Sequence, residues 1–205
     1  MERAREILER AAAALALAAL SPAMALTALA IRVRMGPPVL FRQRRVGIGE
    51  RGFTLYKFRT INEARDAVGH LLPDDQRLTG LGRFLRRASL DELPQLWNVI
   101  RGEMSLVGPR PLPGKYLSRY STRQRRRHDV KPGITGWAQI HGRNALDWDE
   151  KLEMDAWYAE HRSLWLDLRI LAATVGIVLR REGISRSGHA TMPEFPGAIE
   201  QRRPA

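Results

Sequence analysis

The chain has 205 residues, no cysteine and a formal net charge of +12. The absence of cysteine excludes disulfide bonds and thiolate metal sites. Most of the positive charge is carried by arginine, whose planar guanidinium suits bidentate contacts to phosphate. We therefore expect an anionic partner: a nucleic acid, lipid head groups or a phosphorylated small molecule.

Residues 11–31 contain no charged side chain and are mostly alanine and leucine. A helix of this length is about long enough to cross the hydrocarbon core of a bilayer. Pro22 breaks the helical hydrogen-bond ladder near its centre, and Ser21 can satisfy part of what is freed. Arginines flank both ends, so the positive-inside tendency draws both ends to the cytoplasmic face. These features favour a re-entrant membrane helix over residues 1–35, with its break at Ser21 and Pro22.

Three other interpretations of this apolar segment stay open from its residues alone. A true membrane span is the first. A signal peptide is the second, since Ala28-Leu29-Ala30 resembles a cleavage site, although acidic residues before it and arginines after it argue against this. A buried globular helix is the third, although an all-round apolar surface is hard to bury at a chain terminus.

Residues 36–61 predict a β-hairpin at the start of the soluble part. Val39–Phe41 is a short apolar strand, and Phe53–Thr60 alternates between apolar and polar residues. The glycines between them also fit a phosphate loop, but no helix start follows, so a hairpin turn is the better interpretation. The second strand carries two basic residues, Lys57 and Arg59, a pair that by itself is typical of solvated surface.

The stretch from Arg86 to Pro111 begins with a predicted helix. Apolar residues recur at helical spacing from Leu93 to Ile100 and give one apolar face. Ser89 with Glu92 fits a capping box. Pro94 makes such a start irregular because it removes a hydrogen bond. The alternative is a helix that begins properly only at Pro94.

The acidic pair Asp91 and Glu92 in this stretch has two interpretations. Acidic residues at the start of a helix commonly compensate the helix dipole. A carboxylate can also be a nucleophile towards phosphorus, provided that nearby cations neutralise the charge of the phosphoryl group. Arg86, Arg87 and Arg110 lie close in sequence, and this combination favours phosphate chemistry.

The second half of the chain predicts a basic stretch, a loop and two helices. Residues 116–128 are basic, which is typical of a solvated helix face, a lipid-head-group patch or a phosphate contact. The glycine-rich residues 131–144 suit recognition of a nucleotide or sugar. The two helices are predicted over Leu146–His161 and Ser163–Glu182. Three tryptophans on them favour an interfacial role: Trp148, Trp157 and Trp165.

These residues together resemble the bacterial sugar transferase family, the small monotopic phosphoglycosyl transferases. The segments that carry the resemblance are Lys57-Phe58-Arg59-Thr60, Ser89-Leu90-Asp91-Glu92-Leu93-Pro94-Gln95-Leu96-Trp97-Asn98, Gly108-Pro109-Arg110-Pro111 and Lys131-Pro132-Gly133-Ile134-Thr135-Gly136. Residues 72–78 and 141–144 are similar to the PglC-type branch. The resemblance implies an α+β fold, with a mainly helical catalytic domain at 36–185 that contains a small β-hairpin or sheet. It also implies an N-terminal re-entrant membrane helix at 1–35 and interfacial amphipathic helices. Residues 186–205 are expected to form a loosely held tail.

The resemblance also implies a reaction at the cytoplasmic face of the bacterial inner membrane. A phosphosugar moves from a UDP-sugar to undecaprenyl phosphate, UMP leaves, and Mg²⁺ is needed. Asp91 is then the nucleophile that forms a phosphosugar-aspartyl intermediate. Asp91 and Glu92 are the expected Mg²⁺ ligands, and the PglC-type residues imply an N-acetylated deoxyamino sugar such as diacetylbacillosamine. The substrate-binding candidates are Lys57, Arg59, Arg86, Arg110, Gln139, Arg143 and Asn144.

Two rival functions explain the sequence less completely than this transferase does. A basic nucleic-acid-binding protein would explain the charge, but the chain shows no finger, RRM or basic-zipper pattern, so we expect no nucleic acid. A non-catalytic membrane scaffold would explain the apolar N-terminus and the tryptophans, but not an acidic pair amid arginines. Membrane phospholipids are expected partners, and the sequence leaves the oligomeric state open.

Overall fold

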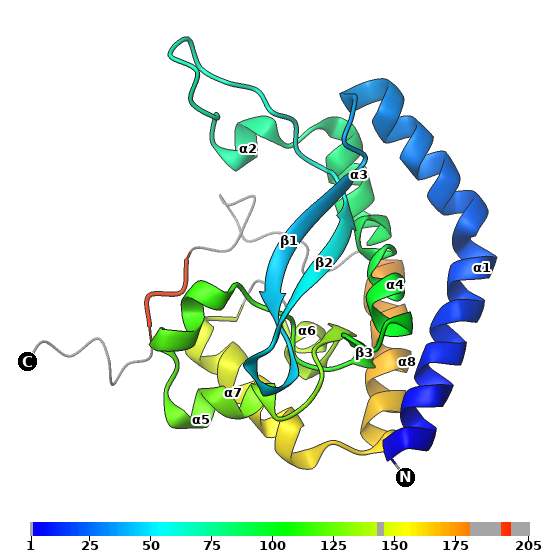
Figure 1. Cartoon of the computed structure of the whole chain (residues 1–205), viewed down its shortest axis with the longest axis vertical. Coiled ribbons are helices and arrows are strands. Elements are labelled where there is room, and N and C mark those ends of the chain that lie inside the picture. Colours follow the sequence, from blue (N-terminus) through cyan, green and yellow to red (C-terminus); the bar gives the residue numbers. More distant parts are fainter. Residues whose placement is uncertain (1, 143–145, 181–193, 198–205) are drawn as a thin grey trace, which may run out of the picture.

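The structure is a computed structural model that describes residues 2–142, 146–180 and 194–197. Its helices are α1 (Glu2–Met35), α2 (Asp74–Arg77), α3 (Gly80–Arg87), α4 (Gln95–Ile100), α5 (Thr122–Arg125), α6 (Trp137–Ile140), α7 (Trp148–His161) and α8 (Leu164–Arg180). Short 3-10 helices are η1 (Ile48–Glu50), η2 (Leu90–Glu92), η3 (Gly114–Arg119) and η4 (Arg126–His128). The strands are β1 (Leu40–Val46), β2 (Gly52–Phe58), β3 (Ser105–Val107) and β4 (Gly133–Thr135). This mainly helical arrangement with two small sheets confirms the predicted α+β fold (Figure 1).

Helix α1 runs along one side of the protein and bends near its middle (Figure 1). The expected break does not interrupt the helix, because Pro22 lies inside it. Pro22 has no N–H to donate to the carbonyl of Ala18, four residues earlier. Ser21 Oγ donates to that carbonyl at 2.8 Å. The predicted helix-break-helix is therefore one continuous, bent helix whose lost backbone bond is replaced by a side chain.

Most of the apolar surface of α1 is uncovered. Ala13 and Ile31 are fully buried against the rest of the protein. The exposed apolar side chains are Ile7, Leu8, Leu15, Leu20, Leu26, Leu29 and Val33. By length and composition α1 is long and apolar enough to cross a membrane, and only 11% of its most apolar 18-residue segment is buried. A helix that leaves so much apolar surface open is not a core helix, which supports membrane association.

Buried polar contacts attach the first turns of α1 to the rest of the protein. Arg5 pairs with Asp167 on α8. The hydroxyl of Tyr158 donates to Asp167 Oδ1 at 2.6 Å and lies 3.2 Å from the carbonyl of Val107. Glu9 accepts a hydrogen bond of 2.7 Å from Ser105 Oγ. These contacts fix α1 relative to strand β3.

Strands β1 and β2 form the predicted antiparallel hairpin, in a register that runs from Leu40 opposite Phe58 to Val46 opposite Gly52. The glycine-rich segment between them is a turn, as predicted, with Gly49 in the left-handed region at φ 57°.

The parallel pair β3 and β4 was not predicted. Ser105 lies opposite Gly133, and Val107 lies opposite Thr135. A Cβ on Gly133 would overlap the backbone nitrogen of Gly108, so this close approach requires glycine. Each strand has three residues, too few to show an alternating pattern. The pair matters because β3 leads directly into the Gly108–Pro111 segment.

The C-terminal segment is held more firmly than predicted over the residues that the structure describes. Phe195 is fully buried and packs against the rings of Tyr116, Tyr120 and Trp148. Glu194 accepts hydrogen bonds of 2.8 Å from Lys115 and Arg119. The expectation of a loosely held tail is therefore wrong for residues 194–197, because an aromatic anchor stabilises them; residues 186–193 and 198–205 lie outside the described part.

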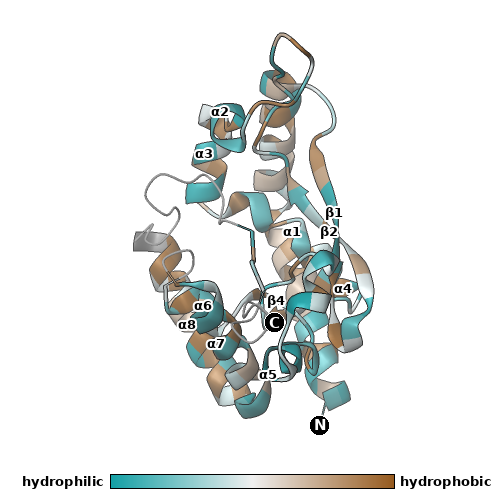
Figure 2. Cartoon of the chain, turned by 90° about the vertical axis from the view of Figure 1, so that its left-hand side faces the viewer, coloured by the Kyte–Doolittle hydropathy of each residue, from teal (hydrophilic) through white to brown (hydrophobic). Residues whose placement is uncertain are grey.

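The three predicted interfacial tryptophans have different surroundings. Trp148 contacts the aromatic cluster around Phe195, and Trp157 stacks on Trp137 with ring centroids 4.9 Å apart. Trp165 is 77% exposed. It belongs to an exposed apolar face of α8 with Leu164, Leu168 and Val175. Hydrophobic colouring follows this helix in Figure 2, as expected of an interfacial helix.

Candidate active site

The acidic pair lies in η2, between helices α3 and α4. Ser89 adopts the left-handed conformation at φ 54°, and its side chain makes no capping hydrogen bond, so the predicted capping box is wrong. The chain instead turns through η2, and α4 begins at Gln95, directly after Pro94. The alternative of a regular helix that starts at Pro94 is thus confirmed, and the carboxylates sit on the turn that precedes it.

Glu92 is held by two cations. Its Oε1 accepts 2.7 Å hydrogen bonds from Lys57 Nζ on β2 and from Arg110 Nη2. Arg110 Nη1 lies 3.5 Å from the second oxygen, Oε2. Burial alone would raise the pKa of Glu92, but the charges of Arg110 and Lys57 outweigh it and hold this pKa well below its usual range. Glu92 is therefore ionised and fixed in place.

Asp91 is the contrasting member of the pair. Its side chain is 8% exposed, yet no hydrogen bond or ion pair joins its carboxylate to another of the described residues. Burial, and then the charge of Glu92, raise the pKa of Asp91 to about 6, against the opposing charges of Lys57, Arg110 and Arg86. Asp91 thus presents an unpartnered carboxylate among fixed cations, as a nucleophile for a phosphoryl group requires.

Arg86 reaches the site from the last turn of α3. Its Nε donates to Thr60 Oγ1 at 3.1 Å, and its charge acts on Asp91. Helix α3 approaches the strand end closely because Gly82 faces the carbonyl of Thr60, where a Cβ would overlap the oxygen. The structure therefore brings four of the predicted site residues around Asp91: Lys57, Arg86, Glu92 and Arg110.

A buried ion pair behind Arg110 was not predicted. Arg127 Nη2 donates to the backbone carbonyl of Arg110 at 2.6 Å and to Asp155 Oδ2 at 2.8 Å. The side chains of Arg127 and Asp155 are 1% and 2% exposed. Arg127 lies near the end of a basic run for which the sequence predicts either a solvated helix face or an anion contact. No local pattern in the sequence indicates its burial, since its partner lies on α7. Arg127 and Asp155 position the backbone of Arg110.

The remaining candidates lie elsewhere. The guanidinium of Arg59 donates to the carbonyls of Met35, Gly36 and Pro37 at 2.5 to 3.1 Å. This places its charge at the carbonyl end of α1, where a cation is favourable. Gln139 on α6 has both amide atoms buried without a partner among the described residues. Arg143 and Asn144 lie outside the described residues. The substrate-binding roles of these four stay predictions.

A magnesium ion fits the acidic pair by its chemistry. Among the described residues, no group of three or more acidic, histidine or cysteine side chains gathers to hold a metal. Mg²⁺, however, is commonly bound by one or two carboxylates together with substrate phosphates. Among the described residues, the carboxylate of Asp91 is hydrogen-bonded to no cation, and Oε2 of Glu92 has only the long contact of 3.5 Å with Arg110, so both can serve as ligands.

The uncovered apolar helix supports membrane association. Carboxylates set among basic side chains are suited to phosphorylated ligands. Comparison with known proteins identifies the family. The bacterial sugar transferase family model matches residues 1–181. The chain therefore belongs to the bacterial sugar transferase family, as its sequence predicted.

Three relatives illustrate the family. The uncharacterized sugar transferase EpsL of Bacillus subtilis is 54% identical over 84% of this chain and 85% of that protein. The UDP-glucose:undecaprenyl-phosphate glucose-1-phosphate transferase of Xanthomonas campestris is 40% identical over 86% of this chain. A protein of the same name from Caulobacter vibrioides is 42% identical over 85%. The chain spans 39% of the Xanthomonas protein and 69% of the Caulobacter protein.

Proposed function

We propose that the protein transfers a sugar 1-phosphate from a UDP-sugar to undecaprenyl phosphate and releases UMP. The observation that carries this proposal is the difference between the contacts of the two carboxylates in the acidic pair. Glu92 binds Lys57 and Arg110, whereas the carboxylate of Asp91 has no hydrogen-bonded partner in the part of the chain that the structure describes. The names of the relatives from Xanthomonas and Caulobacter describe a transfer of this kind.

The reaction proceeds in two displacements. A carboxylate oxygen of Asp91 attacks the phosphorus that carries the sugar. The bond from that phosphorus to the bridging oxygen breaks, and UMP leaves with the electron pair. A phosphate oxygen of undecaprenyl phosphate then attacks the same phosphorus, and the aspartyl bond breaks. The product is a lipid diphosphate sugar, and Asp91 regains its carboxylate.

The cations around Asp91 supply the electrostatic part of catalysis. Phosphoryl transfer spreads negative charge over the equatorial oxygens, and fixed positive groups stabilise it. We propose that Arg86 and Arg110 contact these oxygens, and that Glu92 orients Lys57 and Arg110, to which it is hydrogen-bonded. Mg²⁺, held by Asp91 and Glu92 with the diphosphate, would neutralise further charge when bound. The two residues would thus serve both as catalytic side chains and as metal ligands.

The setting of this reaction is proposed as the cytoplasmic face of the bacterial inner membrane. Arginines lie at both ends of the apolar part of α1, and the helix bends at its middle (Figure 1). Both features fit a monotopic helix that enters and leaves through one leaflet. The site then lies beside membrane phospholipids, where a water-soluble donor and a lipid acceptor meet.

For the sugar we infer an N-acetylated deoxyamino sugar such as diacetylbacillosamine, which the PglC-type residues 72–78 and 141–144 support. The relatives are named for several sugars, including glucose and N-acetylgalactosamine. A panel of UDP-sugars therefore tests the sugar separately from the reaction.

The test measures UMP release from that panel by purified protein with undecaprenyl phosphate and Mg²⁺. We expect release that requires a UDP-sugar and is greatest with the diacetylbacillosamine donor. Asp91→Asn should abolish it, and Asp75→Asn, a change at an exposed carboxylate, should not. Release that is equally fast in Asp91→Asn would refute the assignment of the nucleophile.

A further inference from the structure

Helix α3 presents three different faces. Successive residues of a helix are about 100° apart, so Leu81 and Leu85 share one face, Gly82 and Arg86 the next, and Arg83 and Arg87 a third. Leu85 is buried in a cluster with Ile31 of α1. Arg86 turns to Thr60 and the acidic pair. The third face, with Arg83 and Arg87, is exposed and has no role in the site described above.

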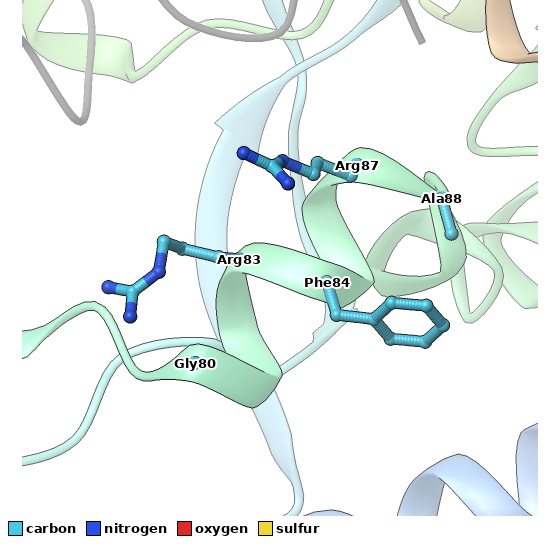
Figure 3. A pocket seen from close by; sticks show the side chains of 5 residues that line it. All are labelled: Gly80, Arg83, Phe84, Arg87 and Ala88. Carbon is cyan, nitrogen blue, oxygen red and sulfur yellow. The ribbon is translucent and has the colours of Figure 1, made fainter.

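This third face, together with the adjacent face that carries Phe84, lines a pocket of about 200 Å³. Figure 3 shows its lining: the guanidinium groups of Arg83 and Arg87 extend from the same side of α3, and the ring of Phe84 lies to the other side. Gly80 and Ala88 complete the lining. The space beside Gly80 is open, since a Cβ there would meet nothing closer than the guanidinium of Arg83, at 3.8 Å.

The positive charge in this pocket is not neutralised by the described part of the chain. Arg83 donates to the carbonyl of Leu78 at 2.9 Å and, like Arg87, forms no ion pair with a described carboxylate. Two guanidinium groups one helical turn apart can hold a phosphate between them. The pocket therefore selects an anionic ligand.

The same pocket has an apolar side. Phe84 is 56% exposed, which is unusual for a large apolar ring. On the helix it lies between the arginines and the buried face that packs on the second half of α1, near Met24 and Ala28. That half of α1 exposes Leu26 and Leu29. A ligand that matches these surfaces combines a phosphate with a hydrocarbon chain.

We propose that this pocket binds the polyprenyl phosphate acceptor, with its phosphate on Arg83 and Arg87 and its first isoprene units on Phe84 and α1. The proposal rests on the proposed function. Ala88, at the edge of the pocket, is three residues before Asp91, and Arg86 next to Arg87 acts electrostatically on Asp91. An acceptor held here has its phosphate on the helix that leads into η2, and its hydrocarbon chain next to the apolar surface of α1.

The test separates the two displacements in protein reconstituted into vesicles. The first displacement is measured as a burst of UMP with UDP-sugar and no acceptor. The second is measured as the KM for undecaprenyl phosphate. For the double variant Arg83→Gln/Arg87→Gln we expect an unchanged burst, and a KM for the acceptor raised by about tenfold or more, because charged hydrogen bonds to phosphate are lost. Phe84→Ser should raise the same KM by a smaller factor.

The matched control is Arg51→Gln, at an exposed arginine on the β1–β2 turn. It should leave both quantities unchanged. The unchanged burst also shows that each variant is folded. An unaltered acceptor KM in the double variant, with only a weaker, salt-dependent attraction to phosphatidylglycerol vesicles, would overturn the proposal in favour of a phospholipid patch. A raised KM for the UDP-sugar would overturn it as well. Failure of the parent protein to release UMP at all would instead contradict the proposed function.

Discussion

Two neighbouring groups of buried charges in this protein differ in how completely they are paired. In the acidic pair, Glu92 is bound to Lys57 and Arg110, but Asp91 lacks a partner among the described residues. In the supporting pair, Arg127 and Asp155 bind each other and are almost fully buried. Arg127 joins the two groups through the carbonyl of Arg110. The paired residues Arg127 and Asp155 stabilise the fold, whereas the carboxylate of Asp91 is available for a reaction.

This comparison predicts opposite effects on stability for two Asp→Asn changes. The largest effect on activity should come from Asp91→Asn, with a loss of at least about a thousandfold in UMP release, since the nucleophile is gone. Its stability should rise. Burial raises the pKa of Asp91 to about 6, so the carboxylate that is ionised at pH 7 opposes folding. Removing it should stabilise the fold by up to about 3 kcal/mol. Denaturant unfolding at pH 7 measures this, and a destabilised variant would contradict it.

Asp155→Asn should destabilise the protein. Burial raises the pKa of Asp155 as well, but here the removal of the carboxylate leaves the buried guanidinium of Arg127 without its counter-charge, which costs about 3–5 kcal/mol. The same unfolding measurement applies, with Asp129→Asn as the control at an exposed carboxylate. A double variant that replaces both Arg127 and Asp155 by leucine should be less destabilised than the single variant. If Asp155→Asn unfolds like the parent, the supporting pair has no structural role.

His128, which follows Arg127 in the chain, should make the stability of the fold depend on pH. Burial, with the charge of Arg127, lowers the pKa of His128 to about 4. The unfolded chain, with a histidine pKa near 6.5, binds the proton first as the pH falls. Stability should therefore be full above about pH 6.5 and decrease towards pH 4, by up to about 3 kcal/mol. Unfolding curves across this range should show a smaller decrease in His128→Phe, and an equal decrease would refute the assignment.

The smallest effect is expected at the bend of α1. Ser21 donates to the carbonyl that Pro22 leaves without a partner. Ser21→Ala should destabilise the protein by about 1 kcal/mol, as the loss of one hydrogen bond does. In the same background Pro22→Ala should restore the backbone bond and remove the effect of the serine change. Thermal unfolding of the four proteins in detergent measures the coupling, and additive effects would contradict it.

The sequence was a good guide where neighbours along the chain decide the structure. The hairpin, the helix start after Pro94 and the boundary between α7 and α8 follow from local patterns and turn residues. Lys57 and Arg110 were proposed as site residues because they match the family motifs, and the structure places both on Glu92.

The sequence was a poor guide where partners are far apart. Arg127 and Asp155 are 28 residues apart, and their burial depends on how η4 meets α7. The β3–β4 pair depends on a close approach between glycine-containing segments. Phe195 is buried only because Tyr116, Tyr120 and Leu152 gather around it. None of these contacts has a local pattern that would reveal it.

The most direct test of the central claim is intact-protein mass spectrometry after acid quenching of the protein with a UDP-sugar and no acceptor. The account predicts an increase in mass equal to one phosphosugar, located on the peptide that contains Asp91. The adduct should be absent in Asp91→Asn and should disappear when undecaprenyl phosphate is added. UMP released without an adduct, or an adduct that persists in Asp91→Asn, would contradict it.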